Sequence, residues 1–414
     1  HLVLRRQRQM CIRDRYHTEI PIWYTDDDKV LIVPPKGGYV RPWCEDPPEG
    51  SFAIDRETRE ILGTIEELGY TKFSGEEKVF DTWMDSSNSN LFVSGYGKND
   101  VNFARAYPTA LRPQGKEIVR TWLYYTLLKS AHLLDQPGFK SVWIDGLGMD
   151  PWGRKMSKSW GNGIDANSVL DCGLSGKTGS WQIRGPDGKS VRLRANKIGS
   201  ECFRLWKAAD AQVGDDFHIN PEEIESKYFG ILTKIYNVAR FASQFPIEDE
   251  KPSVIKPEDV WILSEYDNLI KETIEDWRRI DIYSATQKLK VFMTGIFSSH
   301  WMELAKSRLY DSESSSLWTI HTVLRGCLKI FSPVCPLFCH HLSTTLYNES
   351  TMKVDVYPEP QGYDLHDRSK VTQSIVKFNT MVWKEKKSLN VSLKSEIKDI
   401  EIPDLLQEYS DGLS

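Results

Sequence analysis

Two lysines three residues apart carry the clearest chemical signal in this sequence. Lys155 and Lys158 belong to the run Lys-Met-Ser-Lys-Ser at residues 155–159, which has glycines on both sides. An ammonium group on a flexible stem is a compact point charge, whereas a guanidinium favours a fixed, two-pronged geometry. The spacing therefore predicts a mobile loop whose lysines can close over a polyphosphate.

The residues before this run predict the element that positions it. Residues 141–144, Ser-Val-Trp-Ile, are largely β-branched or aromatic, which is typical of a short buried strand. Open α/β sheets bind nucleotides at the carboxyl ends of their strands. The sequence thus favours a nucleotide ligand at this edge. The competing interpretation is that Lys-x-Ser-Lys by itself is a solvated loop.

Length and composition narrow the class of protein. A chain of 414 residues predicts two or three domains, and a net charge of −5 leaves any nucleic-acid contact to local patches. Seven cysteines without a Cys-x-x-Cys pair do not suit a secreted disulfide framework, so a cytoplasmic location is expected. The most apolar windows, such as residues 330–342, are short and broken by prolines, so no membrane span is expected.

The run at residues 155–159, following a strand and a glycine-rich turn, resembles the signature loop of class I aminoacyl-tRNA synthetases. The resemblance implies that Lys155, Ser157 and Lys158 are catalytic and that the lysines stabilise the pyrophosphate of ATP. Met156 is expected to join the lysines in binding ATP. Gly146 takes the place of a glycine that holds adenine through its backbone. The implied cofactors are ATP and Mg²⁺.

A second segment resembles a wall of the amino-acid pocket in this family. Residues 81–87 read Asp-Thr-Trp-Met-Asp-Ser-Ser, which is closer to the valyl than to the isoleucyl members. Asp81 and Trp83 are expected to line the pocket, with Trp83 against the aliphatic side chain of the substrate. Trp122 is a candidate for a second aromatic wall. On local grounds a core tryptophan remains the alternative for both indoles.

Residues 115–118 stand where the family has a motif that binds the ribose of adenosine. Gly115 lets the backbone approach a ligand, and Glu117 opens a helix expected to run to about Leu134. That helix is apolar on nearly every face and is therefore expected to be buried. Gly115 and Glu117 are carried over as ATP contacts. The alternative for Glu117 is a carboxylate that favours the helix dipole.

Between the loop and a helix expected to start at Gly199, the sequence predicts a basic β-hairpin. Two alternating runs, residues 180–184 and 189–194, flank a Gly-Pro-Asp-Gly turn. The hairpin resembles an insertion relative to the family. Its arginines could meet RNA, and a solvated hairpin is the competing interpretation.

Beyond Pro221, apolar residues recur at intervals of three, four and seven residues, which predicts an antiparallel helical bundle. The wording of residues 301–310 resembles the anticodon-binding bundle of valyl and isoleucyl enzymes. Lys306 and Arg308 are then expected to contact tRNA phosphates. In the tail, residues 389–393 and 397–402 are expected to form strands.

The resemblance implies an α/β, Rossmann-like class I synthetase catalytic domain, of which this is the C-terminal part. An all-α anticodon-binding helical bundle and a small C-terminal α/β appendage follow it. The expected segments are the catalytic remainder at 1–170, the inserted hairpin at 171–198, a connecting helical segment at 199–222, the bundle at 223–350 and the appendage at 351–414.

The implied activity is ATP-dependent activation of valine and its transfer to tRNA(Val), by a monomer with no membrane or DNA partner. The sequence contains no His-x-Gly-His element and nothing like an editing domain. We therefore expect a partial chain that does not form adenylate by itself. Only Cys44 occurs where relatives often carry a cysteine-paired zinc site, so no metal site is expected. Two alternatives stay open: an isoleucyl-tRNA synthetase, and a non-catalytic tRNA-binding paralogue.

Overall fold

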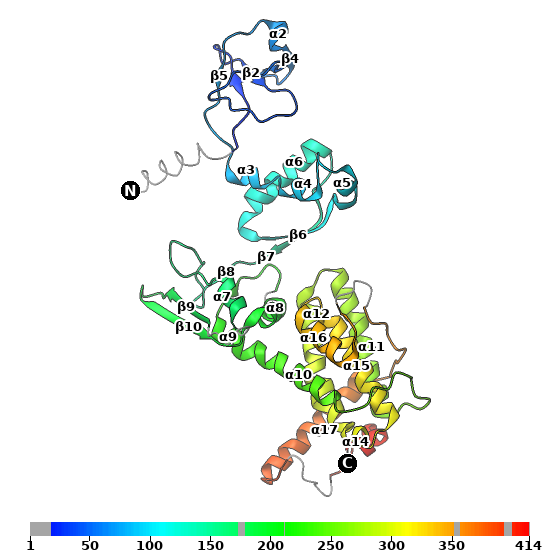
Figure 1. Ribbon diagram of the computed structural model, residues 1–414. Helices are drawn as coiled ribbons and strands as arrows, with labels where there is room; N and C mark the ends of the chain where they lie inside the picture. Colours follow the sequence, from blue (N-terminus) through cyan, green and yellow to red (C-terminus); the bar gives the residue numbers. More distant parts are fainter. Residues whose placement is uncertain (1–17, 173–178, 211, 352–356, 393–399, 414) are drawn as a thin grey trace. The chain divides into compact units, whose positions relative to one another are not determined.

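The computed structural model describes residues 18–172, 179–210, 212–351, 357–392 and 400–413. The chain divides into two units, residues 1–144 and 145–414, and many of their helices and strands are labelled in Figure 1. Each unit is described by itself below. The division falls inside the segment that was expected to form the catalytic remainder.

The first unit begins with a small sheet of strand order β4-β3-β2-β1-β5, all antiparallel where the pairing is recorded. Its elements are β1 Trp23–Tyr24, β2 Val30–Val33, β3 Phe52–Asp55, β4 Ile61–Thr64, α2 Ile65–Leu68 and β5 Ser74–Gly75. Trp23, Ile32 and Ala53 form its core, each at most 1% exposed. The indole N–H of Trp23 donates to the carbonyl of Glu45 at 2.7 Å, so the buried ring keeps its polar atom paired.

The second half of this unit carries several candidate site residues. Its elements are α3 Thr82–Ser86, α4 Ser89–Ser94, α5 Asp100–Ala106, β6 Thr109–Gly115, the 3₁₀ turn η1 Lys116–Ile118, the π-helical turn η2 Val119–Leu123, α6 Tyr124–Leu134 and β7 Phe139–Asp145. Strand β6 pairs with β7. The strand predicted at residues 141–144 and the helical run predicted from Glu117 to Leu134 are both confirmed as elements. The expected burial of the strand is wrong, because Ser141 and Ile144 are exposed and Val142 and Trp143 are half-buried.

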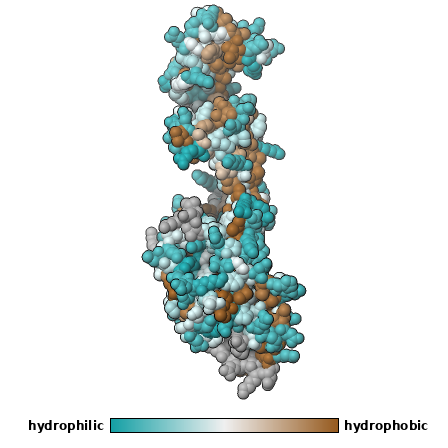
Figure 2. Space-filling model, turned by 90° about the vertical axis from the view of Figure 1, so that its right-hand side faces the viewer, coloured by the Kyte–Doolittle hydropathy of each residue, from teal (hydrophilic) through white to brown (hydrophobic). Residues whose placement is uncertain are grey.

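The expectation that this helix is buried is wrong for the part of the chain that the structure describes. Thr126 and Ser130 are the buried residues of α6, whereas Tyr124 and Leu133 are 55% and 54% exposed. Apolar side chains of the first unit also reach the surface from α4, where Phe92 is exposed, and Figure 2 shows such brown side chains at the surface. A periodic pattern identifies apolar faces but does not identify what covers them.

The second unit begins with the loop that contains residues 155–159. Strand β8, Gly148–Met149, pairs in parallel with β11, Phe217–His218. Between them lie α7 Ala166–Asp171, β9 Gly179–Arg184, β10 Ser190–Ala195 and α8 Gly199–Asp210. The antiparallel pairing of β9 with β10 confirms the predicted hairpin, and α8 confirms the predicted helix start.

The hairpin is buried on one face, while its arginines Arg184, Arg192 and Arg194 are exposed, which fits both interpretations of those arginines. Trp181, Ile183 and Leu193 are at most 6% exposed and belong to the core of the second unit. Successive side chains of a strand point to opposite faces, so the hairpin has one buried apolar face and one exposed polar face.

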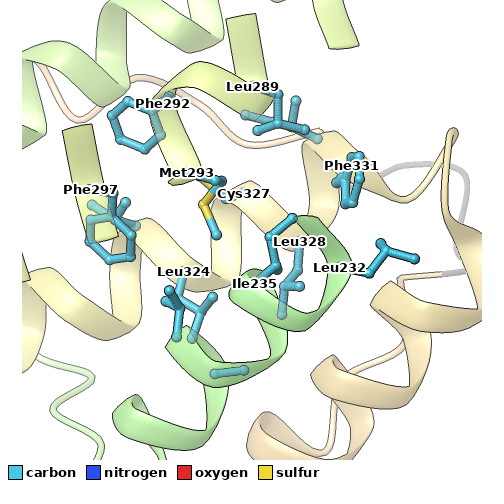
Figure 3. Close-up of a cluster of buried hydrophobic side chains, with 14 of the residues drawn as sticks. Leu232, Ile235, Leu289, Phe292, Met293, Phe297, Leu324, Cys327, Leu328 and Phe331 are labelled. Carbon is cyan, nitrogen blue, oxygen red and sulfur yellow. The ribbon is translucent and has the colours of Figure 1, made fainter. Parts of the chain in front are cut away.

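The predicted helical bundle is confirmed. Its elements are α9 Pro221–Ile224, η3 Glu225–Phe229, α10 Gly230–Ala242, α11 Pro257–Arg278, α12 Ile282–Val291, η4 Phe292–Trp301, α13 Met302–Leu304, α14 Lys306–Tyr310, α15 Ser314–Phe331 and α16 Pro336–Tyr347. Figure 3 shows Ile235 from α10 among side chains of α15, with Leu324 and Leu328 also fully or almost fully buried. Predicted core positions such as Leu263 and Ile270 are 0% exposed.

The C-terminal appendage is helical in the residues that the structure describes. Helix α17, Arg368–Ser388, is followed by η5 Asp404–Tyr409 and α18 Ser410–Leu413. Ile375 and Leu406 are 0% exposed, so both α17 and η5 contribute to the core. The strands expected at 389–393 and 397–402 are absent from the described residues 389–392 and 400–402, and residues 393–399 lie outside the described part.

Arg308, expected to contact tRNA, belongs instead to a buried ion-pair group. Its guanidinium donates to the Asp259 carboxylate at 2.7 and 2.9 Å and to Glu313 at 3.1 Å. Asp259 is 0% exposed and also accepts from the Trp301 indole and the Ser315 hydroxyl. Burial alone would lower the pKa of Arg308, but the hydrogen bond and charge of Asp259 raise that pKa overall. The structure thus gives Arg308 a structural role in place of the expected phosphate contact.

The neighbouring Lys306 provides a matched comparison, because its side chain is 42% exposed and, among the described residues, pairs only with exposed Glu303 at 3.3 Å. We predict that Arg308→Met destabilises the second unit by about 3–5 kcal/mol, since it leaves Asp259 buried without its cation. Lys306→Met should change stability by less than about 0.5 kcal/mol. Urea unfolding followed by far-ultraviolet circular dichroism measures both, and equal midpoints for the two variants would contradict the structural role of Arg308.

Candidate functional site

A buried carboxylate shapes the loop at residues 146–162. Asp150 is 0% exposed, and its Oδ1 accepts the backbone N–H groups of Trp152 at 3.0 Å and Arg154 at 2.9 Å. Its Oδ2 accepts from Arg154 Nε at 2.8 Å and from Asn162 Nδ2 at 2.9 Å. A buried carboxylate persists when it is paired with a cation and fully hydrogen-bonded, as here. Asp150 therefore ties the turn before the two lysines to the residue after them.

Asn162 also forms hydrogen bonds to the backbone of the lysine run itself. Its side chain is 0% exposed, and its Oδ1 accepts the backbone N–H of Ser157 at 2.9 Å. Its Nδ2 also donates to the backbone carbonyl of Lys155 at 3.1 Å. One buried amide thus fixes the backbone at the first and third residues of the run.

The side chains of the run differ in exposure. Lys155 and Lys158 are exposed, whereas Met156 and Ser157 are half-buried. The methyl carbon of Met156 lies 3.4 Å from where a Cβ on Gly148 would stand, and the Ser157 hydroxyl accepts the N–H of Trp160 at 3.2 Å. The loop therefore has a shaped backbone with two ammonium groups on flexible stems, which suits it to bind a polyphosphate.

Asp150 stays ionised near neutral pH, so the conformation of the loop should not change with pH in that range. Burial alone would raise the pKa of Asp150, but hydrogen bonds from Arg154 and Asn162 bring it below its usual value of 3.8. A depressed carboxyl pKa contributes stability above the unfolded pKa, and that stability is lost only as pH falls through the lower folded value. The loop is therefore expected to keep its conformation across the physiological range.

Gly146, expected to hold adenine through its backbone, is explained by packing within the second unit. A Cβ at this position would overlap the carbonyl of Asp215 and lie 2.8 Å from the backbone nitrogen of Asp216. The N–H of Gly146 already donates to the Asp145 carboxylate at 3.0 Å. The structure thus gives Gly146 a packing role, and its expected backbone contact with adenine stays a prediction.

In the first unit, Gly115 and Glu117 lie together where β6 ends. A Cβ on Gly115 would come within 2.5 and 2.6 Å of the two carboxylate oxygens of Glu117. The Glu117 side chain is exposed, so it can accept hydrogen bonds from hydroxyl groups of a ligand lying against Gly115. This local arrangement is compatible with a ribose site, and the ATP contacts of these two residues remain predictions.

Gln114 is a candidate functional residue that the sequence reasoning missed. It is 7% exposed, and within the described residues neither its amide oxygen nor its nitrogen has a hydrogen-bond partner. Leaving a buried amide unpaired costs about 1–3 kcal/mol, so a ligand bound at Gly115 would gain from pairing with it. The available signal was a polar residue directly before the glycine that permits a close approach.

The three residues expected to form the amino-acid pocket have different environments. The Asp81 carboxylate accepts the N–H of Trp83 at 2.8 Å and caps helix α3. Trp83 is 38% exposed, so its indole is free to contact a substrate. Trp122 is 4% exposed, its N–H donates to Ser86 at 3.0 Å, and the Arg112 guanidinium lies 3.8 Å from its ring centre. Trp122 therefore has the environment of a core residue.

The described ranges contain neither a metal cluster nor a membrane-spanning helix. No group of three or more His, Cys, Asp or Glu side chains in them is arranged to hold a metal ion. None of their helices combines the length and the apolar character that crossing a bilayer requires.

Two family models match the chain. Residues 3–220 match tRNA synthetases class I (I, L, M and V), and residues 259–402 match the anticodon-binding domain of tRNA ligase. The order of the two matches confirms the expected α/β catalytic part followed by a helical anticodon-binding domain. A solved LeuRS from Agrobacterium radiobacter K84, in a ternary complex with tRNA and LeuAMS, shares this fold with a TM-score of 0.54 and 14% identity, covering 83% of this chain and 41% of its own.

Curated relatives carry the name valine–tRNA ligase. The protein from Aeropyrum pernix is 31% identical over 94% of this chain and 44% of its own length, and that from Pyrobaculum aerophilum is 31% identical over 93% and 45%. The Nanoarchaeum equitans relative is 30% identical over 96% and 47%. This chain thus spans a little under half the length of these relatives. Because the first model covers more than half of its residues, the chain belongs to the class I tRNA synthetase family.

Proposed function

We propose that this chain forms part of an enzyme that activates valine with ATP and transfers it to tRNA(Val). The observation that carries the proposal is the loop at residues 155–159, where a buried carboxylate and amide shape the backbone and leave two lysines exposed. The names of the relatives and the valyl-like wording of residues 81–87 both favour valine over isoleucine.

In the first step, a carboxylate oxygen of valine bonds to the α-phosphorus of ATP. The bond from that phosphorus to the bridging oxygen breaks, and pyrophosphate leaves with the electron pair. Negative charge grows on the leaving group, where Lys155 and Lys158 stabilise it. Ser157 acts on the loop itself, because its N–H and hydroxyl are already bonded within the loop. No side chain needs to act as a nucleophile, so positioning supplies much of the remaining rate enhancement.

The first unit supplies the contacts to the rest of the substrates. Glu117 accepts hydrogen bonds from the ribose hydroxyls, Gly115 allows the close approach, and Gln114 pairs with a polar group of the bound ligand. Trp83 packs against the isopropyl group of valine, and Asp81 holds Trp83 by capping its helix. These roles are supported by the exposure of Trp83 and Glu117 and by the unpaired amide of Gln114.

In the second step, a hydroxyl of the terminal tRNA adenosine bonds to the valyl carbonyl carbon, and AMP leaves. Lys306 in the bundle is the remaining candidate for a tRNA phosphate contact, since its side chain is exposed. The described residues offer no carboxylate cluster for Mg²⁺, so the ion is expected to arrive on the phosphates of ATP, where it would supply charge neutralisation.

Valine-dependent exchange of pyrophosphate into ATP tests the first step. We expect exchange from the longest open reading frame that contains this chain, and none from residues 1–414 alone. Lys155→Met and Lys158→Met should each lower kcat by about 10²–10³-fold, because each removes a charge that acts on the leaving group. Lys271→Met, an exposed lysine on α11, is the control and should leave exchange unchanged. Undiminished exchange in both loop variants would refute the proposed role of the lysines.

The pocket is tested by Trp83→Ala. Loss of the aromatic wall should raise the KM for valine by about 10–100-fold, because burying an aliphatic side chain in such a pocket is worth about 1–3 kcal/mol. Phe92→Ala removes another exposed aromatic ring of the first unit, 68% exposed, and should change the KM for valine little. If both variants retain the parent KM for valine, Trp83 is not part of the pocket.

A further inference from the structure

The hairpin β9–β10 has a polar face that the proposed chemistry does not use. Side chains alternate along both strands, so burial of Trp181, Ile183 and Leu193 leaves the other set in solvent. The exposed set is Ser180, Gln182 and Arg184 on β9 and Ser190, Arg192 and Arg194 on β10. We call these six residues the outer face of the hairpin. The outer face contains hydrogen-bond donors and no carboxylate.

Charge on the hairpin is opposite to that of the chain as a whole. Residues 179–195 contain three arginines, one lysine and a single carboxylate, Asp187, whereas the whole chain has a net charge of −5. Lys189 pairs with Asp187 only at 3.9 Å, and both are well exposed. The Cα atoms of Arg192 and Arg194 are about 7 Å apart and their side chains lie on the same face, so each can reach a different phosphate of one strand.

The packing beneath the hairpin holds the outer face in place. The carboxylate of Glu222 accepts the backbone N–H of Arg194 at 2.8 Å, and that of Glu225 accepts the N–H of Lys197 at 2.6 Å. Both acids therefore bond the backbone and leave the side chains of Arg192 and Arg194 available, whereas Arg184 Nε donates to the carbonyl of Gly188 at 3.1 Å. A cationic surface on a fixed scaffold loses less side-chain and loop entropy on binding than one on a floppy loop.

The hairpin is also attached directly to the loop that carries Lys155 and Lys158. The backbone N–H of Arg184 donates to the carbonyl of Gly161 at 3.0 Å. The Arg154 guanidinium, which already bonds buried Asp150, also donates to the carbonyl of Gly185 at 3.1 Å and to that of Arg184. The outer face of the hairpin is therefore directly adjacent to the end of the loop.

An exposed indole lies at this junction. Trp160 is 60% exposed and, with Ser159, lines a hollow of about 330 Å³ together with the hairpin turn. The other lining residues are Arg154, Arg184, Gly185, Pro186 and Gly188. A flat aromatic ring beside guanidinium groups is the combination on which unpaired nucleic-acid bases stack while their phosphates pair with cations.

We propose that the outer face of the hairpin, together with Trp160, binds a single strand of RNA that leads to the loop at residues 155–159. Arg192 and Arg194 contact consecutive phosphates, and one unpaired base stacks on Trp160 near Arg184. The proposal rests on the proposed function, since the unpaired 3′ end of a tRNA is an RNA strand of this kind. It deepens that function by assigning the hairpin a part in holding the strand.

Binding of a fluorescently labelled ten-nucleotide RNA to the whole 414-residue chain, measured by anisotropy at several salt concentrations, tests the proposal. Arg192→Gln with Arg194→Gln should weaken binding on the order of tenfold and reduce the slope of log K against log salt by about 1.4, or 0.7 per phosphate contact. Glutamine keeps most of the side-chain length, and thermal unfolding checks that the hairpin still folds. Arg278→Gln, an arginine on α11 with a 71% exposed side chain, is the control and should match the parent.

Trp160 is tested separately with the same RNA and with a blunt RNA duplex. Trp160→Ala should weaken binding of the single strand about tenfold, Trp160→Phe should restore most of it, and neither should affect the duplex. The proposal is overturned if the double arginine variant keeps the parent affinity and salt slope, or if the Trp160 variants act equally on both RNAs. Because this assay contains neither valine nor ATP, its outcome is independent of pyrophosphate exchange, and a failure of the proposed function is seen only in the exchange assay.

Discussion

The buried carboxylate of Asp150 is the constraint on which the candidate site depends. Its partners lie on both sides of the lysine run, Arg154 before it and Asn162 after it, and all three side chains converge under the backbone. The same Arg154 reaches the hairpin turn. A single charge removed from water thus fixes the loop, leaves Lys155 and Lys158 in solvent, and connects the loop to a cationic surface.

Local patterns in the sequence were sufficient to predict much of the fold. Apolar spacing placed helices such as α10 and α11, and the Gly-Pro-Asp-Gly turn placed β9 and β10. These patterns depend on residues within one helix or strand. They therefore predict the type of secondary structure more reliably than the burial of that element. Helix α6 shows the limit, since its apolar residues correctly indicated a helix and wrongly indicated burial.

The sequence suggested candidate site residues where the pattern is local. Lys155 and Lys158 became candidates because they lie within one loop, and Gly115 and Glu117 because they lie at one turn; their contacts with ATP stay predictions. Arg308 was misassigned because its partner Asp259 is far away in sequence. The packing constraint on Gly146 was missed because the backbone at Asp215 is also far away in sequence. Buried polar groups such as Gln114 and Asn162 were missed because the sequence alone does not show whether a polar side chain is buried.

Amide hydrogen exchange at Ser157 tests most directly whether Asp150 and Asn162 shape the loop. The Ser157 N–H donates to the buried oxygen of Asn162 at 2.9 Å, so it should exchange slowly in the parent chain. Asn162→Ala should raise its exchange to a rate typical of an exposed loop, while amides in the core of the bundle stay protected. Equally fast exchange of the Ser157 amide in the parent and in the variant would contradict the account.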